Sequence, residues 1–524
     1  MSATLTPSGG AVSAATDRPA IFDDRALFGH PRGLGLLFIT EMWERFSYYG
    51  MRALLVLYLV NALKWTTASA ANLYGTYTML VYLTPVVGGY LADRFIGTRR
   101  SLVIGSIIIA LGHFTMAIPG MTTFYLGLGF IIIGTGFFKS NVSTMVGQIY
   151  GKGDERRDSG FTIFYIGINT GAFLGPIICG ALAQNPRFGW HYGFAAAGVG
   201  MVLGLIGYLW YRDKYLPGIG ITVKRTPEQQ RAHDDAVADT RVGNPIVHGG
   251  IGAVIGAVVG WFLGSGSLLG LAMGLIIGAA LGITVLGTRG EERRRVIALF
   301  IVVFFVIFFW AAYEQAGTSM NLFADKNTNL NLGSFKIPSS WFQSVNSFFI
   351  IVLAPLFAMM WTALGRRRRE PSTALKMVLG LALLATGFLF MVIGGSRADT
   401  GVLVSPMWLV LAYAFHTCGE LCLSPVGLSY VTKVAPAKFA SLLMGVWFLA
   451  NAAANKIAGS LAAYTPVPGE KAAAPASGLG GFIQSVSATN HGFYMIFVVA
   501  GFVAAAVMLL FVPLLKRLTA SVNA

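Results

Sequence analysis

The most informative residues are four ionisable side chains inside one apolar segment, residues 34–60. They are Glu41, Glu44, Arg45 and Arg52. Each costs about 2.5–3.5 kcal/mol at the centre of a bilayer, so together they cost about 10–14 kcal/mol. The twelve Leu, Ile, Phe and Val residues of the segment return only about 4–7 kcal/mol. This segment therefore cannot face lipid, and it must line a protein interior or a water-filled cavity.

The spacing of these charges predicts one functional face. Positions 41, 45, 48 and 52 are four, three and four residues apart, so a helix places them on the same side. A purely structural interpretation is a buried ion pair between Glu41 and Arg45. Such a pair would need neither the second carboxylate, Glu44, nor the adjacent Tyr48 and Tyr49. We therefore expect this face to bind a charged solute or to carry a proton.

Three further ionisable residues lie alone in later apolar segments. Lys139, Glu314 and Glu420 have no near partner of opposite charge on their own helices, so their partners must come from other helices. Helix direction and depth place Arg52 and Glu314 together in the outer half of the membrane. Lys139 and Glu420 are available for the same purpose on the inner side. We expect these pairs to act as gates, which form in one conformation and break in another.

The composition excludes a soluble protein. Of the 524 residues, 55% are hydrophobic and 11% are charged, and the mean hydropathy is +0.66. Soluble domains carry about 25% charged residues. We find no HExxH or GxSxG motif and no cluster of Cys and His, so a membrane-embedded hydrolase or transferase has no support. The protein is expected to be an integral membrane protein and not an enzyme.

Fourteen segments are long and apolar enough to cross a bilayer, which takes about 20 residues. They lie near 34–60, 73–93, 101–119, 122–150, 160–183, 191–211, 247–264, 267–287, 296–320, 341–364, 374–394, 403–432, 437–463 and 489–515. Six precede a long polar stretch and six follow an arginine cluster at 293–295, with a glycine-rich hairpin between them. Two related six-helix halves are the plan of many transporters. We therefore predict an all-α membrane protein of two bundles.

The predicted organisation has four parts. They are a cytosolic tail (1–28), an amino-terminal six-helix bundle (29–212), a linker with an extra transmembrane hairpin at about 247–287 (213–294), and a carboxyl-terminal six-helix bundle (295–524). Of the 38 Lys and Arg residues, 28 fall on the side of the tail, six on the opposite side and four within spans. The positive-inside rule then places both termini in the cytoplasm. Topology thus explains the net charge of +16, and we expect no nucleic-acid partner.

Three motifs resemble a known family. The first is Glu41-x-x-Glu44-Arg45-Phe46-x-Tyr48-Tyr49-Gly50, the second is Phe164-Tyr165-x-x-Ile168-Asn169-x-Gly171, and the third is Gly89-Tyr-Leu-Ala-Asp93-Arg94-Phe-Ile-Gly97-Thr-Arg99-Arg100. The third resembles the loop signature of the major facilitator superfamily, and the first two resemble signatures of its proton-dependent oligopeptide transporters. The resemblance runs from about residue 29 to the last helix. The hairpin is similar to the two extra helices of bacterial members.

The resemblance implies roles for particular residues. In this family, the positions of Arg45 and Lys139 are associated with the carboxylate end of the peptide. The position of Glu420 receives the peptide ammonium, with help from Asn169 and Asn346. The residues that resemble the walls of the side-chain pocket are Tyr49, Tyr82, Trp310 and Trp447. Opposite charges at the two ends of the site would bind the ammonium and the carboxylate that all zwitterionic peptides share. Loosely packed aromatic walls would tolerate varied side chains.

The resemblance also implies proton-coupled import of di- and tripeptides by alternating access. Animal members carry a His in the second span, and residues 72–94 contain none, so coupling would fall to carboxylates, first of all Glu41 and Glu44. We expect no cofactor besides the proton gradient, a monomer in the lipid bilayer of the bacterial inner membrane, and peptides and protons as ligands. A facilitator-fold proton antiporter for drugs or other small solutes is the alternative. Anion transport is disfavoured by the negative charge of Glu420.

Overall fold

The amino-terminal half is a succession of long helices. The structure is a computed structural model that describes residues 20–151, 153–221, 243–263, 268–470 and 478–520. Its first helices are α1 (Arg32–Leu57), α2 (Thr67–Leu91), α3 (Thr98–Met116), α4 (Met121–Gln148), α5 (Arg156–Ala183) and α6 (Trp190–Tyr215). A short 3-10 turn, Ala20–Phe22, precedes α1, and π-helical turns Tyr58–Ala62 and Ala92–Ile96 extend α1 and α2. The predicted spans of this half correspond to these helices.

The hairpin and the carboxyl-terminal half follow in the same way. The hairpin consists of α8 (Pro245–Leu263) and α9 (Leu268–Leu286). The long helices after it are α10 (Gly290–Tyr313), α12 (Gln343–Arg366), α13 (Thr373–Ala398), α14 (Met407–Val434), α15 (Ala440–Ala462) and α17 (Asn490–Leu518). The shorter elements are the 3-10 turns Glu314–Gly317, Ser339–Phe342 and Ala437–Phe439, helices α11 (Ser319–Lys326) and α16 (Gly478–Val486), and the antiparallel strands β1 (Asn331–Leu332) and β2 (Phe335–Lys336).

One predicted span is interrupted in the structure. The segment predicted as 296–320 divides into α10, which ends at Tyr313, a 3-10 turn that begins at Glu314, and α11, which begins at Ser319. Thr318 between them has φ −126° and ψ −92°, which is outside the helical region. The hydropathy pattern did not show the break, because the strongly apolar residues of α10 dominate the predicted span, although α11 after the break is much less apolar. The break places the charged Glu314 at a helix end, where its carboxylate can reach another helix.

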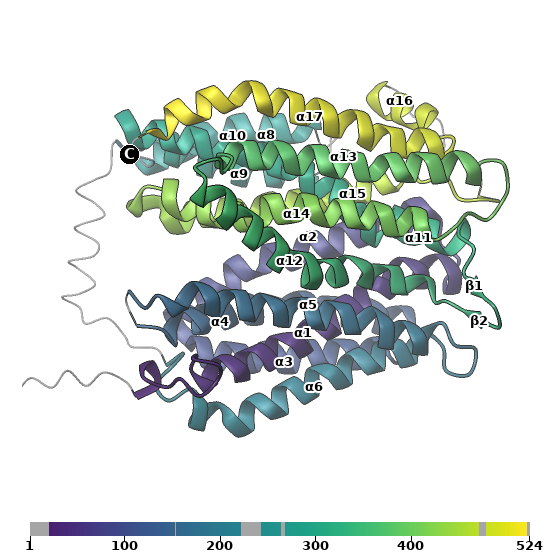
Figure 1. Ribbon diagram of the computed structural model, residues 1–524, viewed down its shortest axis with the longest axis horizontal. Coiled ribbons are helices and arrows are strands. Elements are labelled where there is room, and N and C mark those ends of the chain that lie inside the picture. Colours follow the sequence, from purple (N-terminus) through teal and green to yellow (C-terminus); the bar gives the residue numbers. More distant parts are fainter. Residues whose placement is uncertain (1–19, 152, 222–242, 264–267, 471–477, 521–524) are drawn as a thin grey trace, which may run out of the picture.

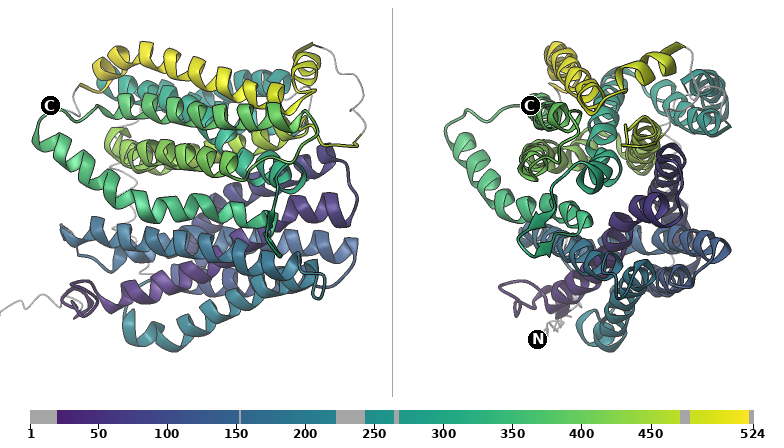
Figure 2. Two further views of the ribbon diagram at one scale, coloured as in Figure 1. Left: turned by 45° about the vertical axis from the view of Figure 1, so that its right-hand side comes forward. Right: turned by 90° about the vertical axis from the view of Figure 1, so that its right-hand side faces the viewer.

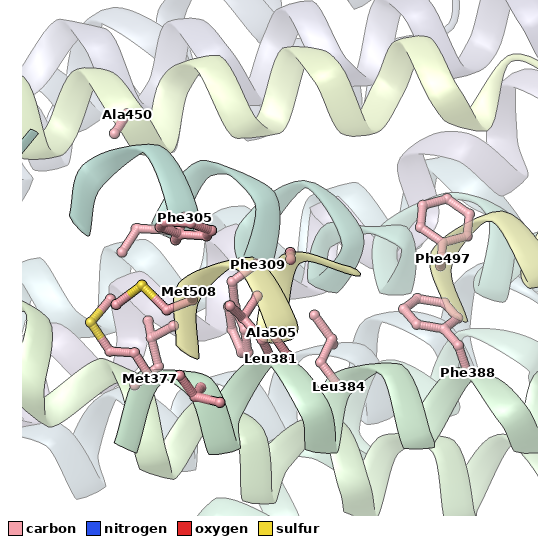
Figure 3. Close-up of a cluster of buried hydrophobic side chains, with 14 of the residues drawn as sticks. Phe305, Phe309, Met377, Leu381, Leu384, Phe388, Ala450, Phe497, Ala505 and Met508 are labelled. Carbon is pink, nitrogen blue, oxygen red and sulfur yellow. The ribbon is translucent and has the colours of Figure 1, made fainter. Parts of the chain in front are cut away.

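The helices form two groups that lie side by side. Figure 1 shows α1, α3, α4, α5 and α6 in the lower group and α10, α13, α14, α15 and α17 in the upper group, with α2 and α12 towards the junction; the two views of Figure 2 agree. Each half has its own buried apolar clusters. In the upper group, the ring of Phe388 on α13 stacks on Phe497 of α17 at a centroid distance of 4.8 Å (Figure 3). Separate cores allow each bundle to move as a unit.

Small residues bring the two bundles together. A Cβ atom added to Gly75 of α2 would lie 2.8 Å from the Cα of Gly459 on α15. Such close backbone approach is typical of helix packing within membranes, where glycine allows extensive dispersion contact. On the other flank, the indole nitrogen of Trp341 donates to the carbonyl of Ile177 on α5 at 3.0 Å. The bundles therefore meet along α2–α15, and where the carboxyl-terminal part of α5 meets the start of α12.

The surface fits a protein that crosses the membrane several times. Seven of the described helices are long and apolar enough to span a bilayer by length and composition, and three shorter segments are apolar as well. Large apolar side chains are exposed on the outside of the bundles, for example Leu510 (78% exposed) and Trp210 (77% exposed). In water such exposure would be costly, whereas lipid makes it favourable. The total of fourteen spans stays a prediction.

Candidate functional site

The ionisable residues of α1 are all buried. Glu41, Glu44, Arg45 and Arg52 expose 3%, 1%, 4% and 6% of their surface. Arg45 Nε lies 3.0 Å from Glu41 Oε1, and the same guanidinium pairs with the carboxylate of Glu44. Two carboxylates thus share one guanidinium on a single helix. Because a buried charge is costly unless it is paired, the guanidinium offsets the cost of burying the two carboxylates, while the carboxylates repel each other.

Several polar atoms of this cluster lack hydrogen-bond partners among the described residues. They include Nη2 of Arg45 and Oε2 of Glu41. A buried donor or acceptor without a partner costs about 1–3 kcal/mol, and more when it is charged. Arg45 also lies over the ring of Tyr48, 5.2 Å from its centroid. The cluster therefore retains capacity to bind a further polar group.

Lys139 of α4 extends the positive side of the site. Its ammonium lies 3.7 Å from the centroid of the Tyr82 ring, which is a cation–π contact. It also interacts electrostatically with Arg45, Glu44 and Glu41. Cations from two helices of the amino-terminal bundle therefore act on the same region.

Glu420 of α14 is the anionic counterpart in the other bundle. It is 7% exposed. It accepts hydrogen bonds from the hydroxyl of Tyr313, from Asn346 Nδ2 at 3.1 Å and, across the junction, from the hydroxyl of Tyr165 at 3.4 Å. Asn346 also donates to Thr417 at 2.9 Å. These donors, two from the same bundle and one from the other, hold the carboxylate in one orientation.

The remaining predicted residues lie in several environments. Asn169 donates to the carbonyl of Tyr165 at 2.9 Å on its own helix. Trp310 packs edge-to-face against Tyr313 with centroids 5.0 Å apart, so it adjoins the donors of Glu420. Trp447 is 6% exposed within the apolar cluster of the carboxyl-terminal bundle. Tyr49 contacts Tyr48 (5.1 Å) and lies under Arg52 (5.7 Å).

Arg52 joins the two bundles near the carboxyl end of α1. Its guanidinium forms an ion pair with Glu314 and a hydrogen bond with the hydroxyl of Tyr74 on α2. Further polar contacts cross the junction nearby. Asn61 Nδ2 donates to Asp325 at 2.9 Å, and the amide of Thr67 donates to Glu470 at 2.7 Å. The described residues thus show the bundles closed against each other at this end.

The second expected gate is not formed in this conformation. In the part of the chain that the structure describes, no ion pair joins Lys139 to Glu420. His416, one turn before Glu420, packs against the ring of Phe388 (4.5 Å). The side chain of Asp93, in the third motif, lies outside the described part. Lys456 donates to Thr76 at 3.0 Å, which links α15 to α2.

Tyrosines are the main residues that sequence reasoning left without a role. Tyr165 and Tyr313 donate to Glu420, and the hydroxyl of Tyr74 accepts a hydrogen bond from Arg52. Tyr165 lies within the second motif, and Tyr313 precedes Glu314 directly, so both positions carried a signal. Nothing local indicated Tyr74, because its contact depends on the approach of α1 and α2 to α10. No group of three or more His, Cys, Asp or Glu that could hold a metal occurs among the described residues.

Two helix bundles around a buried site with charges of both signs define a membrane transporter of the two-bundle kind. The model of the POT family matches residues 99–217 and 274–477. The chain therefore belongs to the POT family, and the resemblance seen in its motifs is confirmed.

Relatives and solved structures agree with this assignment. The chain is 41% identical over 443 residues to an uncharacterized transporter, YclF, of Bacillus subtilis, which covers 83% of this chain and 88% of the relative. It is 37% identical to a di-/tripeptide transporter of Lactococcus lactis, with 83% and 89% coverage. A crystal structure of a mutant peptide transporter POT in complex with alafosfalin is 36% identical, has a TM-score of 0.77 and covers 95% of this chain and 98% of its own. The architecture is accordingly the major facilitator type.

Proposed function

We propose that this protein is a proton-coupled symporter that imports di- and tripeptides by alternating access. The observation that carries the proposal is the division of buried charge between the bundles. Arg45 and Lys139 belong to the amino-terminal bundle, and Glu420 belongs to the carboxyl-terminal bundle. A zwitterionic peptide brings one carboxylate and one ammonium. A peptide bound to both bundles couples its own binding to their relative movement.

The proposed binding mode assigns each end of the peptide to one side. The carboxylate binds Arg45 and Lys139, and the ammonium binds Glu420, which Asn346 and Tyr313 orient. Asn169 assists from α5. The side chains of the peptide lie against the aromatic residues Tyr49, Tyr82, Trp310 and Trp447. Charge contacts at the common backbone ends give affinity, and the aromatic walls tolerate many side chains.

The names of similar proteins support peptides as the substrate. Relatives include a peptide transporter of Yersinia enterocolitica (36% identical, 83% of this chain and 88% of the relative) as well as the Lactococcus lactis protein. The solved neighbour binds alafosfalin. Because this chain belongs to the same family as those proteins, we propose the same class of substrate for it.

Proton coupling is assigned to Glu41 and Glu44. Both carboxylates pair with Arg45 in the present state. Protonation of one of them weakens its hold on the guanidinium, which becomes available to the peptide carboxylate. Return of Arg45 to the carboxylates then releases the proton on the inside. Arg45 itself stays protonated throughout, since arginine does not titrate in proteins.

Alternating access uses the contacts at the two ends of the bundles. Arg52 and Glu314 close the outer end here, and Lys139 and Glu420 close the inner end in the opposite state. The excess of positive charge in the loops on the side of the tail supports cytoplasmic termini. The membrane of the proposal is the bacterial inner membrane, and the working unit is the monomer.

The orientation is tested by cysteine labelling. In a background without native cysteines, Glu155→Cys and Thr400→Cys place exposed thiols at opposite ends of the bundles. A membrane-impermeant reagent should label Thr400→Cys in intact cells and Glu155→Cys only after permeabilisation. Labelling of both from the same side would overturn the topology.

The function is tested in proteoliposomes. Labelled dialanine should accumulate when an inward proton gradient is imposed, and an uncoupler should abolish the accumulation. Absence of uptake above empty vesicles would contradict peptide import. Efflux of the solute against an inward proton gradient would instead indicate an antiporter.

A further inference from the structure

A groove on the membrane-facing side separates the inserted hairpin from the carboxyl-terminal bundle. It has a volume of about 420 Å³ and lies between α9, α10 and α17. Its lining is entirely apolar: α9 contributes Leu281 and Val285, α17 contributes Val507 and Phe511, and α10 contributes five residues from Ile297 to Phe305. The volume is in the range of about 300–1,000 Å³ that small-molecule sites have.

The groove stays open because the two helices of the hairpin pack against each other through their glycine residues. A Cβ atom on Gly256 of α8 would lie 2.1 Å from the carbonyl oxygen of Gly274 on α9, and the reverse contact is equally close. The two helices are therefore packed backbone to backbone. On α9, the side chains of Leu281 and Val285 face α10 and α17 across the groove.

The groove lies within one half of the bilayer. It extends along α10 from Ile297 to Phe305, which is eight residues or about 12 Å at 1.5 Å per residue. One leaflet of the hydrocarbon core is about 15 Å thick. The groove begins one turn after the charged start of α10, so its mouth is at the level of lipid headgroups on the side that we assign to the cytoplasm.

Cations surround that mouth. The Nε atom of Arg293 donates to the carbonyls of Val285 (3.0 Å) and Thr288 (2.9 Å), which fixes its guanidinium between the end of α9 and the start of α10. Arg294 is exposed, and it shares a helix face with Ile297 and Ile301 because the spacings are three and four residues.

Other charged residues near the mouth add to its positive electrostatic potential. Lys516 and Arg517 are exposed at the end of α17, beyond Phe511. The neighbouring acids are paired: Glu292 lies 2.6 Å from Lys438, and Glu291 lies 3.6 Å from Arg295. The mouth therefore carries net positive charge.

We propose that this groove binds an anionic phospholipid of the cytoplasmic leaflet. One acyl chain lies along the aromatic side of α10, and the phosphate contacts Arg293 and Arg294. Basic pockets between membrane helices are suited to anionic headgroups, and each cation near the headgroup strengthens binding. The lipid fills the space between the hairpin and the bundle and joins them. This site is separate from the peptide site and extends beyond the proposed function.

Native mass spectrometry of the purified full chain tests the proposal. Phosphatidylglycerol and phosphatidylcholine with the same acyl chains are titrated against the protein in detergent. Phosphatidylglycerol should bind more tightly. The Arg294→Gln variant should weaken its binding about fivefold, as expected for one cation near a headgroup. The matched control is Arg367→Gln, an exposed arginine of the loop after α12, which should change nothing.

A second variant tests the apolar part of the site. Ile297→Trp fills the groove from an exposed position and should lower phosphatidylglycerol binding about tenfold or more, because the acyl chain loses its apolar contacts. Ile393→Trp on α13, also exposed to lipid, is the control, and unchanged melting temperatures verify folding. Equal binding of both lipids, equal effects of Arg294→Gln and Arg367→Gln, or full affinity in Ile297→Trp would each overturn the proposal. A dimer that Ile297→Trp dissociates would assign the groove to a second copy of the chain. Lipid binding is measured without transport, so its failure is distinguishable from failure of the proposed function.

Discussion

Arg45 and Arg52 lie two turns apart on the same helix, and both are buried, yet their partners differ in kind. Arg45 pairs with Glu41 and Glu44 on its own helix, whereas Arg52 pairs with Glu314 of the other bundle. A pair within one helix survives any rigid movement of the bundles. A pair between bundles must break when their outer ends separate.

This difference separates binding from gating. Rigid movement of the bundles leaves Arg45 beside Glu41 and Glu44, so proton exchange and peptide binding, and not the movement itself, change the pairing within this cluster. The net stability of a buried ion pair is small once desolvation is counted, and the cost of breaking it by removing one partner is large. The Arg52–Glu314 pair can therefore form and break with a small change in free energy, as a gate requires. The following experiments test this separation.

The largest effect is expected from Arg45→Ala. Removal of one partner from a buried charged set costs about 3–5 kcal/mol, and it also removes the proposed contact with the peptide carboxylate. Dialanine uptake in proteoliposomes should fall at least about a hundredfold, since each 1.4 kcal/mol is a factor of ten. Arg32→Ala is the control on the same helix, because the side chain of Arg32 is 56% exposed. Near-normal uptake affinity in Arg45→Ala would show that the carboxylate is held elsewhere.

The Glu44→Gln variant should separate coupling from binding. Glutamine keeps the shape of the side chain but cannot carry a proton. Accumulation driven by a proton gradient should be lost, while exchange of labelled for unlabelled peptide across the membrane should continue. Both activities are measured in the same vesicles, with Glu41→Gln beside it. If accumulation persists in Glu44→Gln, the coupling group is another carboxylate, such as Glu41, Glu314 or Glu420.

The Arg52→Ala and Glu314→Gln variants should shift the conformational equilibrium without removing the binding site. We expect the ratio of outward-open to outward-closed protein to rise about tenfold, or about 1.4 kcal/mol, within the usual range of coupling energies. Electron spin resonance distances between labels at Ala62 and Lys336, at the outer ends of the two bundles, measure this ratio.

The charge swap is the control for this experiment. The Arg52→Glu, Glu314→Arg double variant should partly restore the closed population and transport, since it rebuilds the pair in reverse. Unchanged distance distributions in both single variants would refute the gating role.

The smallest effects concern the hydrogen bonds to Glu420. As for the two arginines, one partner comes from the same bundle and one from the other. Asn346 is a donor from the same bundle at 3.1 Å, and Tyr165 is a donor from the opposite bundle at 3.4 Å. A hydrogen bond to a charged group contributes about 1.5–3 kcal/mol, so Asn346→Ala should raise the KM for dialanine about tenfold. Tyr165→Phe removes a longer and weaker bond, and its KM should rise about two- to threefold. A larger effect for Tyr165→Phe would show that the contact between bundles dominates the site.

Much of this molecule was predictable from local patterns. The long helices follow from runs of apolar residues, and the family follows from motifs such as the one from Glu41 to Gly50. The match to the POT family and to its solved structures confirms both predictions. The break between α10 and α11 was not predicted, because the strongly apolar α10 dominates the span and masks the less apolar residues after Glu314. The roles of Tyr165 and Tyr313 were also missed: their positions beside Asn169 and Glu314 drew attention to them, but only the packing of the helices shows that both hydroxyls reach Glu420.

The sequence by itself determined which side chains must avoid lipid, because an ionised side chain is costly in contact with hydrocarbon wherever it stands along an apolar segment. It thus singled out Arg45, Arg52, Lys139, Glu314 and Glu420. Only the tertiary structure decided which of them meet: Arg52 reaches Glu314, while Glu420 is bound by Tyr313, Asn346 and Tyr165 and not by Lys139. Pairing depends on the packing and relative position of two bundles. Those arise from contacts far apart in the chain, so no local pattern encodes them.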